Sequence, residues 1–268
     1  MNKFKELSQQ VKDFGLARKE NWLDYEDQEK ISRIISSIKP KKGSNKSWLS
    51  VSLRSHLIKL FKLDFKSLSR SFYLLNLAKK YKLQEIADDI FNHRSKLIGI
   101  DFYYNVKSTD PVLDWHCDTA YSGQLNVKNF IHPDDYSIKF FFYLTNVSSD
   151  NGCLSYIPNS NRITHALKKG IYEKKLEYTP YWSLEDYKKT ILIEKNFNYI
   201  KDLLGENLLN EFIKKISFIL ENNKNIRIYD NEIKKGGAVV FDETGIHRGS
   251  KTSLNDRMAL RFFYKKND

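Results

Sequence analysis

The strongest constraint on the fold of this chain is a change of hydrophobic pattern near residue 97. From there on, the chain holds short runs of β-branched and aromatic residues bounded by Gly, Pro, Asn or Asp, which is typical of strands. Because a strand turns alternate side chains to opposite faces, several such strands must pair into sheets that share a core. The runs are LIGIDFYYNV, YSIKFFFYLTNV, GCLSYIP, GGAVVFDE and RMALRFFYKK.

Helical periodicity dominates the remaining chain. In residues 1–96 apolar positions recur every three or four residues, which predicts an N-terminal helical layer. The same spacing returns in a helical insertion, residues 165–235, and is interrupted at Gly205. The β-rich parts are then 97–164 and 236–266. The helical runs of the first part are YEDQEKISRIISSI, SLRSHLIKLFKL, FKSLSRSFYLLNLAKKY and LQEIADDIFNH.

Strands on both sides of an insertion, preceded by helices, favour a jelly-roll or cupin-like barrel whose mouth holds the functional site. We therefore expect one domain over residues 1–268, of a mainly β, α+β class: a jelly-roll or cupin-like barrel with a helical layer and a helical insertion.

Composition excludes several classes of protein. Two cysteines, Cys117 and Cys153, are too few for a secreted disulfide framework. No stretch approaches the roughly 18 to 20 apolar residues of a membrane span, so a soluble cytoplasmic protein without a membrane partner is expected. The net charge of +12 is spread along the chain as lysines. Nucleic acid is therefore not the favoured partner, and the oligomeric state stays open.

A His-x-Asp motif offers two metal ligands. His116 and Asp118 in the run DWHCD are two residues apart, so they share one face of a strand and both side chains reach one ion. Cys117 points to the other face, where packing is the favoured role. The alternative interpretation is a histidine at a strand end paired with a carboxylate.

His247 is the candidate third ligand. It follows the run GGAVVFDETGI, in which an apolar strand ends in a tight turn that delivers an imidazole to the barrel mouth. Two imidazoles and one carboxylate on one face of an octahedral ion are typical of mononuclear non-heme Fe(II) oxygenases. His132, in a loop before Pro133, is a reserve ligand.

Arg257 opens the apolar strand RMALRFFY. A guanidinium buried inside a barrel needs a carboxylate partner, and a diacid cosubstrate such as 2-oxoglutarate provides one. Arg261 shares the same strand face and is the runner-up. The alternative for Arg257 is a surface salt bridge with Asp256 or Glu243.

In this order, the motifs resemble the phytanoyl-CoA dioxygenase-like family of Fe(II)/2-oxoglutarate oxygenases. The resemblance covers roughly residues 98–264 without the insertion and rests on WHCD, FFFYLTNVSSDNGCLSYIPNSNR, GAVVFDETGIHRGS and DRMALRFFY. It implies a double-stranded β-helix, iron bound by His116, Asp118 and His247, and 2-oxoglutarate and O2 as cosubstrates.

The resemblance also implies roles for residues near the metal. Arg257 anchors the C5 carboxylate of 2-oxoglutarate, Ser250 assists it, and Phe141 forms an aromatic wall. The segment from Pro158 to Arg162 departs from the family pattern, because Asn159 stands at the second place, where the family usually has Gly, and the fourth place lacks the usual His. The long insertion is a candidate lid or oligomer contact.

The implied reaction is oxidative decarboxylation of 2-oxoglutarate to succinate and CO2, coupled to hydroxylation of an unidentified small molecule. Asp118 favours hydroxylation, since related halogenases carry a small residue in its place. Alternatives are a nucleic-acid or protein oxygenase of the same superfamily, or a non-catalytic cupin-like binding protein. Candidate substrate contacts are Tyr104, Asn105, Trp115 and Gln124.

Overall fold

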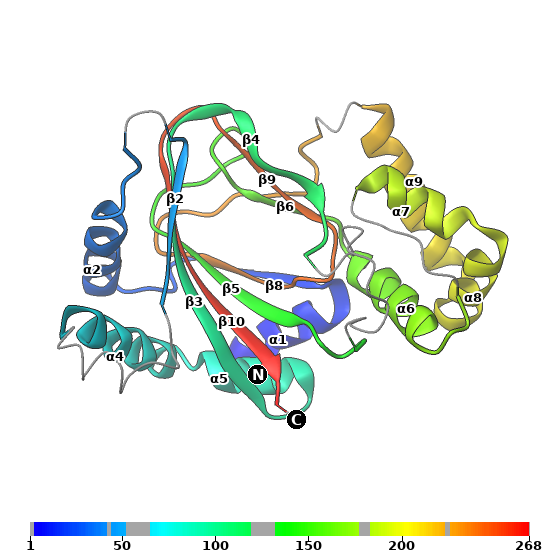
Figure 1. Cartoon of the computed structure of the whole chain (residues 1–268), viewed down its shortest axis with the longest axis horizontal. Helices are drawn as coiled ribbons and strands as arrows, with labels where there is room; N and C mark the ends of the chain where they lie inside the picture. The colour runs from blue at the N-terminus through cyan, green and yellow to red at the C-terminus, as the bar shows by residue number, and fades with distance from the viewer. Residues whose placement is uncertain are drawn as a thin grey trace.

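Two antiparallel sheets face each other in the computed structural model, which describes residues 3–41, 44–51, 65–118, 132–176, 183–222 and 226–267. The larger sheet has six strands in the order β1-β8-β5-β10-β3-β2, and the smaller has four in the order β4-β9-β6-β7 (Figure 1). Their bounds are β1 Leu16–Lys19, β2 Lys46–Ser50, β3 Ser95–Asn105, β4 Ser108–His116, β5 Ser137–Tyr143, β6 Leu154–Tyr156, β7 Asp230–Asn231, β8 Ala238–Asp242, β9 His247–Thr252 and β10 Arg257–Lys266.

Strand β5 shows how the larger sheet separates two cores. Its sequence SIKFFFY is buried at every position, because both faces of the sheet are covered. Phe140 and Phe142 pack into the core under the N-terminal helices. Phe141 and Tyr143 point the other way, into the space between the sheets. The expected α+β double-stranded β-helix is thus confirmed.

The N-terminal helices cover the outer face of the larger sheet. They are α1 Lys3–Phe14, α2 Tyr25–Ser36, α4 Phe65–Lys80 and α5 Leu83–Phe91 (Figure 1). The predicted helices over α2, α4 and α5 are confirmed, and the run SLRSHLIKLFKL lies outside the described residues. Two strands, β1 and β2, also lie within the segment 1–96 that was expected to form the helical layer. Both are short edge strands whose pairing with β8 and β3 supplies the order that their own pattern lacks.

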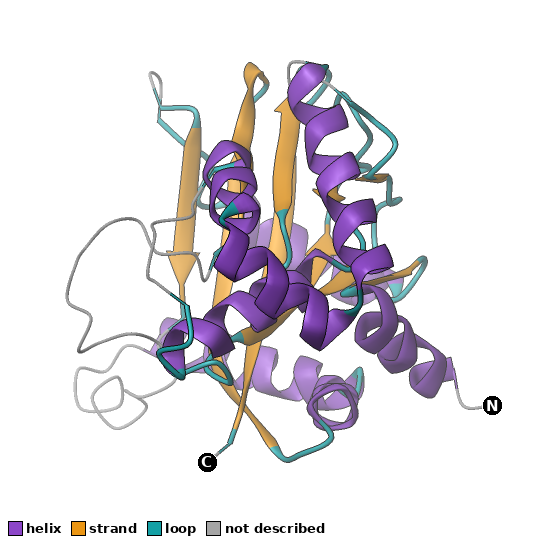
Figure 2. Cartoon of the chain, turned by 90° about the vertical axis from the view of Figure 1, so that its right-hand side faces the viewer, coloured by secondary structure: helices purple, strands orange, loops and turns teal. Residues whose placement is uncertain are grey.

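The insertion forms a second helical layer beside the barrel. It contains α6 Ser160–Tyr172, α7 Leu184–Leu192, α8 Glu194–Leu204 and α9 Glu206–Glu221, seen in front of the strands in Figure 2. The predicted break at Gly205 is confirmed, with a φ of 88° between α8 and α9. Among the described residues, no helix combines the length and the apolar character that a membrane span requires.

The departure from the family pattern at Asn159 is absorbed by its backbone. Asn159 has a φ of 69°, in the left-handed region that asparagine tolerates better than most residues. It precedes the first residue of α6, so the insertion helices begin five residues earlier than the sequence predicted, directly after β6. Consequently, α6 starts beside the strands that carry the candidate site.

Candidate metal centre

Three side chains meet where the smaller sheet ends. His116 is the last residue of β4, Asp118 follows it, and His247 is the first residue of β9, paired in register with His116. Nε2 of His247 lies 3.2 Å from Oδ2 of Asp118, and Nε2 of His116 lies 3.5 Å from Oδ1. Ligand atoms in neighbouring positions of an octahedral ion, with bonds of about 2.1 Å, lie about 3 Å apart. The three side chains therefore fit one metal ion.

Backbone contacts prepare both imidazoles for coordination. Nδ1 of His116 lies 2.6 Å from the carbonyl oxygen of Asp114, and Nδ1 of His247 lies 2.8 Å from that of Gly245. A nitrogen this close to a carbonyl carries the proton and donates it, which leaves the lone pair of Nε2 for a metal. Burial also lowers the pKa of His247, against the attraction of Asp118, so its neutral form is favoured.

The carboxylate ligand, Asp118, is already ionised. Burial opposes the charge of the Asp118 carboxylate, but the ammonium of Lys139 and the two histidines outweigh it and hold its pKa well below the ordinary value. Lys139 forms an ion pair with Oδ2 of Asp118 and lies 3.2 Å from Oε2 of Glu243. A charged carboxylate with two neutral imidazoles is the protonation state that a divalent cation requires.

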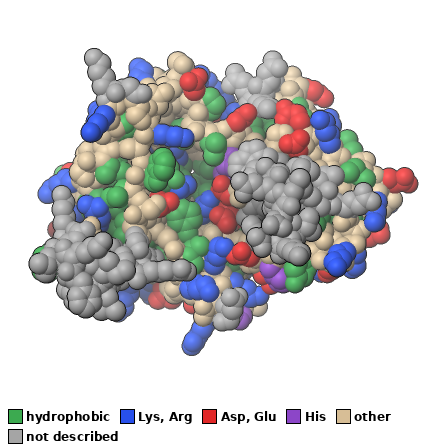
Figure 3. All heavy atoms as spheres, in the orientation of Figure 1, with side chains coloured by type: hydrophobic (Ala, Val, Ile, Leu, Met, Phe, Trp, Pro, Cys, Tyr) green, Lys and Arg blue, Asp and Glu red, His purple; other side chains and the backbone are tan. Residues whose placement is uncertain are grey.

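The three ligands line one cavity of about 190 Å³ between the sheets. Figure 3 shows a hollow on the face toward the viewer, with hydrophobic side chains and Lys or Arg side chains in it. Its other lining residues come from β2, β3, β4, β5, β6, β8, β9 and β10: Lys46, Tyr103, Val112, Leu113, Lys139, Phe141, Leu154, Phe241, Gly249, Arg257 and Arg261. Metal ligands, cations and apolar walls thus share one compartment.

Two arginines of β10 enter this cavity. Arg257 is 3% exposed, stacks at 4.9 Å on the ring of Phe141, and donates from Nη1 to Asn105 at 3.2 Å. Its Nε has no hydrogen-bond partner among the described residues, and no carboxylate there pairs with it. The Nε of Arg261 likewise has no partner there, but this arginine already has a carboxylate: it donates to Asp101 at 3.1 Å and to the Tyr103 hydroxyl. Arg257 is therefore the arginine with capacity for an external carboxylate.

The turn before His247 is held by α6. Nε2 of His165 lies 2.9 Å from Oδ2 of Asp242, and Asn161 donates to the same oxygen at 3.2 Å. The amide of Ile246 donates to the Ser160 hydroxyl at 2.7 Å. His165 and Asn161 therefore help to fix the segment that carries His247.

The segment around His116 is held in the same way. Trp115 and Cys117, its two neighbours, belong to the hydrophobic core of the insertion. The hydroxyl of Tyr187, on α7, lies 3.2 Å from the sulfur of Cys117 and 2.7 Å from the hydroxyl of Thr164. The insertion therefore packs directly behind both histidines, on the side away from the cavity.

The structure places some of the predicted contacts at the cavity and others away from it. Phe141 lines the cavity, and Asn105 is the partner of Arg257. Ser250 does not line it: alternation along β9 puts Gly249 there instead, and the Ser250 hydroxyl donates to the carbonyl of Ser148 at 3.4 Å.

Two of the predicted substrate contacts point away from the cavity. Tyr104 lies on the outer face of the larger sheet, where its hydroxyl donates to Asp256 at 2.7 Å. Trp115 is buried in the core of the insertion, because alternation turns it away from His116. Gln124 lies outside the described residues.

Lys139 is the site residue that sequence reasoning missed. A signal was present, because it is the one charged residue in the apolar run SIKFFFY and has the same parity as Phe141. The alternative partners considered for Arg257 are engaged elsewhere: Glu243 contacts Lys139, and Asp256 contacts Tyr104.

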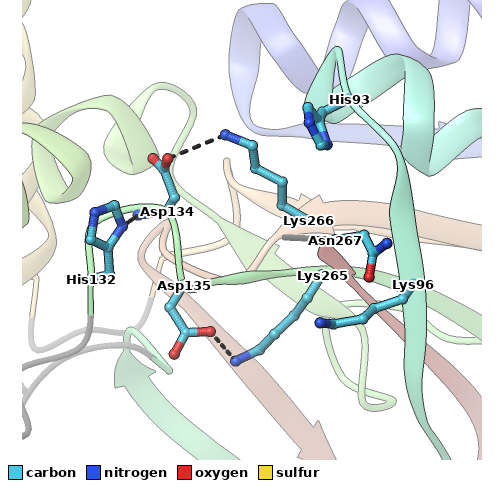
Figure 4. Close-up of a pocket in the computed structure, with 8 residues that line it drawn as sticks. All are labelled: His93, Lys96, His132, Asp134, Asp135, Lys265, Lys266 and Asn267. Atoms are coloured by element: carbon cyan, nitrogen blue, oxygen red, sulfur yellow. Dashed lines mark hydrogen bonds and ion pairs between the residues drawn. The ribbon is translucent and has the colours of Figure 1, made fainter.

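A larger hollow, of about 540 Å³, shows no comparable ligand set among the residues that the structure describes (Figure 4). Its acidic residues are paired with lysines, Asp135 with Lys265 and Asp134 with Lys266. His132 lines this hollow, where its Nδ1 accepts from the Asp134 amide at 3.2 Å, and it is not part of the metal centre. The reserve ligand of the sequence analysis thus lies apart from the three candidate ligands.

Several solved structures have the same fold as this chain. HygX from Streptomyces hygroscopicus, with nickel, 2-oxoglutarate and hygromycin B bound, is 12% identical, with a TM-score of 0.59 over 98% of this chain and 87% of that one. The carbocyclase SnoK from nogalamycin biosynthesis is 12% identical, with a TM-score of 0.58 over 98% and 84%. EctD from S. alaskensis with bound Fe is 12% identical, with a TM-score of 0.56 over 99% and 79%.

The fold and the His-Asp-His centre define a double-stranded β-helix protein of the non-heme iron type. The sequence profile of the phytanoyl-CoA dioxygenase (PhyH) family matches residues 54–259, so the chain belongs to this family. A search of curated protein sequences finds no match. The family resemblance inferred from the motifs is thus confirmed, and with it the class: an oxidoreductase that uses iron and 2-oxoglutarate.

Proposed function

We propose that the protein is an Fe(II)/2-oxoglutarate-dependent dioxygenase that hydroxylates a small molecule and releases succinate and CO2. The observation that carries the proposal is the presence of His116, Asp118, His247 and Arg257 in one cavity. Ligands for a cation and a buried cation for a carboxylate are the two requirements that 2-oxoglutarate chemistry sets for a protein.

The chain supplies the metal site through its own electrostatics. Two neutral imidazoles and the ionised Asp118 would hold ferrous iron on one face and leave positions for other ligands. Bound iron and 2-oxoglutarate together supply the activation of dioxygen that substrate oxidation needs. The retained carboxylate of Asp118 supports hydroxylation, because a halogenase requires that position for a halide.

Arg257 is the proposed anchor of the distal carboxylate of 2-oxoglutarate. Asn105 holds its Nη1, and the Phe141 ring holds the plane of the guanidinium, so the fork is already oriented before an anion arrives. Phe141 then forms one wall beside the cosubstrate. Arg261 is less suited, because Asp101 already neutralises it.

The apolar lining supports a small-molecule substrate. Val112, Leu113, Leu154 and Phe241 line the cavity, and apolar walls of this kind pack against the hydrophobic parts of a small molecule. Among the structures with this fold, HygX was solved with hygromycin B. For this chain we propose only the general class of substrate, namely a small molecule.

An anaerobic titration tests the proposal. Adding Fe(II) and then 2-oxoglutarate to the purified protein should produce a visible absorbance band from the chelate, and admitting air should yield slow succinate. His247→Ala should abolish both signals, because it removes an imidazole ligand, and Asp118→Gly should lose the release of succinate. His132→Ala, at the other hollow, is the matched control and should retain both. A wild-type protein with neither band nor succinate would refute catalysis and favour a non-catalytic binding protein.

A further inference from the structure

Lys139 is buried in apolar surroundings beside the metal centre. Its side chain is 6% exposed, and its ammonium lies 5.9 Å from the ring centre of Phe241 and 5.3 Å from that of Phe263. An ammonium in such a place must be paired to be tolerated. Packing alone would favour an apolar residue at this position, as at the other core positions of β5.

The ammonium of Lys139 contacts two carboxylates. One is Oδ2 of Asp118, and the other is Oε2 of Glu243 at 3.2 Å. Glu243 is itself fixed: its Oε1 accepts from the Ser137 amide at 2.8 Å, and its backbone carbonyl accepts from the Asp118 amide at 3.3 Å. Lys139 and Glu243 thus connect three segments: the His-x-Asp motif, the start of β5 and the turn before His247.

We propose that Lys139 is a positioning residue of the metal centre, which occupies one carboxylate oxygen of Asp118 and sets how strongly that ligand holds a cation. Oδ1 of Asp118 faces His116, whereas Oδ2 is shared by His247 and Lys139. The inference rests on the proposed function, because it takes Asp118 as a ligand of iron.

The charges around Asp118 predict whether Lys139 and Glu243 raise or lower the affinity for a metal ion. A positive ammonium beside the cation position repels a divalent ion and competes with it for the charge of Asp118. Glu243 offsets part of this repulsion from the other side of the ammonium. Lys139 should therefore lower the affinity for the metal and discourage two-oxygen binding by Asp118, which keeps coordination positions open for 2-oxoglutarate and dioxygen. Glu243 should raise the affinity.

Metal titration of two variants tests these opposite signs. Mn(II) is the probe, because it is stable in air and the free ion is followed by its EPR signal. Lys139→Met should bind Mn(II) about tenfold more tightly, because the competing charge is gone. Glu243→Gln should bind it about tenfold more weakly, because Lys139 then acts on Asp118 alone. Lys139→Arg retains the charge and is the matched control, within about threefold of wild type.

A purely structural role for Lys139 gives a different pattern, in which both substitutions weaken binding or neither changes it. Either result would overturn the inference. If Lys139→Met does not fold, as judged by circular dichroism, Glu243→Gln decides, since unchanged affinity there contradicts the proposed electrostatics. Failure of the proposed function is distinguishable: the wild type itself would then bind no Mn(II) and release no succinate with Fe(II).

Discussion

Replacing Arg257 by methionine removes the proposed partner of the distal carboxylate of 2-oxoglutarate while nearly preserving the volume of the side chain. Arg257 is 3% exposed, and its guanidinium donates a hydrogen bond to Asn105. Removing one partner of a buried ion pair costs about 3 to 5 kcal/mol. The cavity opens to solvent (Figure 3), so we expect the lower end of this range, about 3 kcal/mol, or roughly a 150-fold increase in the Kd of 2-oxoglutarate.

The assay is the anaerobic titration of the Fe(II)-loaded protein with 2-oxoglutarate, followed by the visible band. A matched ligand, 2-oxobutanoate, lacks the distal carboxylate and should bind wild type and Arg257→Met equally. Arg257→Lys retains the charge but loses the planar fork, and we expect about a tenfold increase in Kd. The assignment would fail if Arg257→Met left the Kd unchanged while Arg261→Met raised it, or if both ligands weakened equally.

Three further substitutions test the surroundings of the site. Burial opposes the ionised form of Asp242, but contacts such as that with His165 outweigh burial, and the pKa of Asp242 is lowered from 3.8. The ionised carboxylate therefore stabilises the fold above pH 3.8. This contribution is lost as the pH falls through the lowered pKa. In urea denaturation, Asp242→Asn should lower the free energy of unfolding by about 2 kcal/mol at pH 7 and by clearly less at pH 3. Equal losses at the two pH values would contradict a stabilising role of the ionised carboxylate. Gly152→Ala, at a φ of 73°, places a Cβ 2.5 Å from Cδ of Arg257, and should weaken 2-oxoglutarate about tenfold with an unchanged Kd for Mn(II). Tyr187→Phe should cost about 1 kcal/mol in urea unfolding, and an unchanged midpoint would show that its hydroxyl contacts are not needed.

Local pattern predicted the strands and the ligand types well. The runs SIKFFFY and RMALRFFYKK form β5 and β10. Both strands could be predicted because the pattern that marks a strand lies in residues adjacent in the sequence. Edge strands were missed for the opposite reason. β1 and β2 are ordered by their partners, and four or five residues are too few to show a period of two.

Assignments of side chains to the cavity were less reliable. Alternation correctly separated His116 from Cys117, but Ser250 and Tyr104 were assigned to the cavity although they lie on other faces. The pairing of β4 with β9 contains register shifts between Leu113 and His116, and such irregularities cannot be read from one strand alone.

The sequence by itself determined that two histidines and an aspartate stand at strand ends, with an arginine opening a strand further along. Only the tertiary structure decided that the insertion packs behind the histidines, and that Lys139 and Glu243 meet at Asp118. The physical reason is the range of the forces involved. Backbone geometry acts between adjacent residues, whereas the pairing of a buried charge depends on which distant segments the packed core brings within a few ångströms.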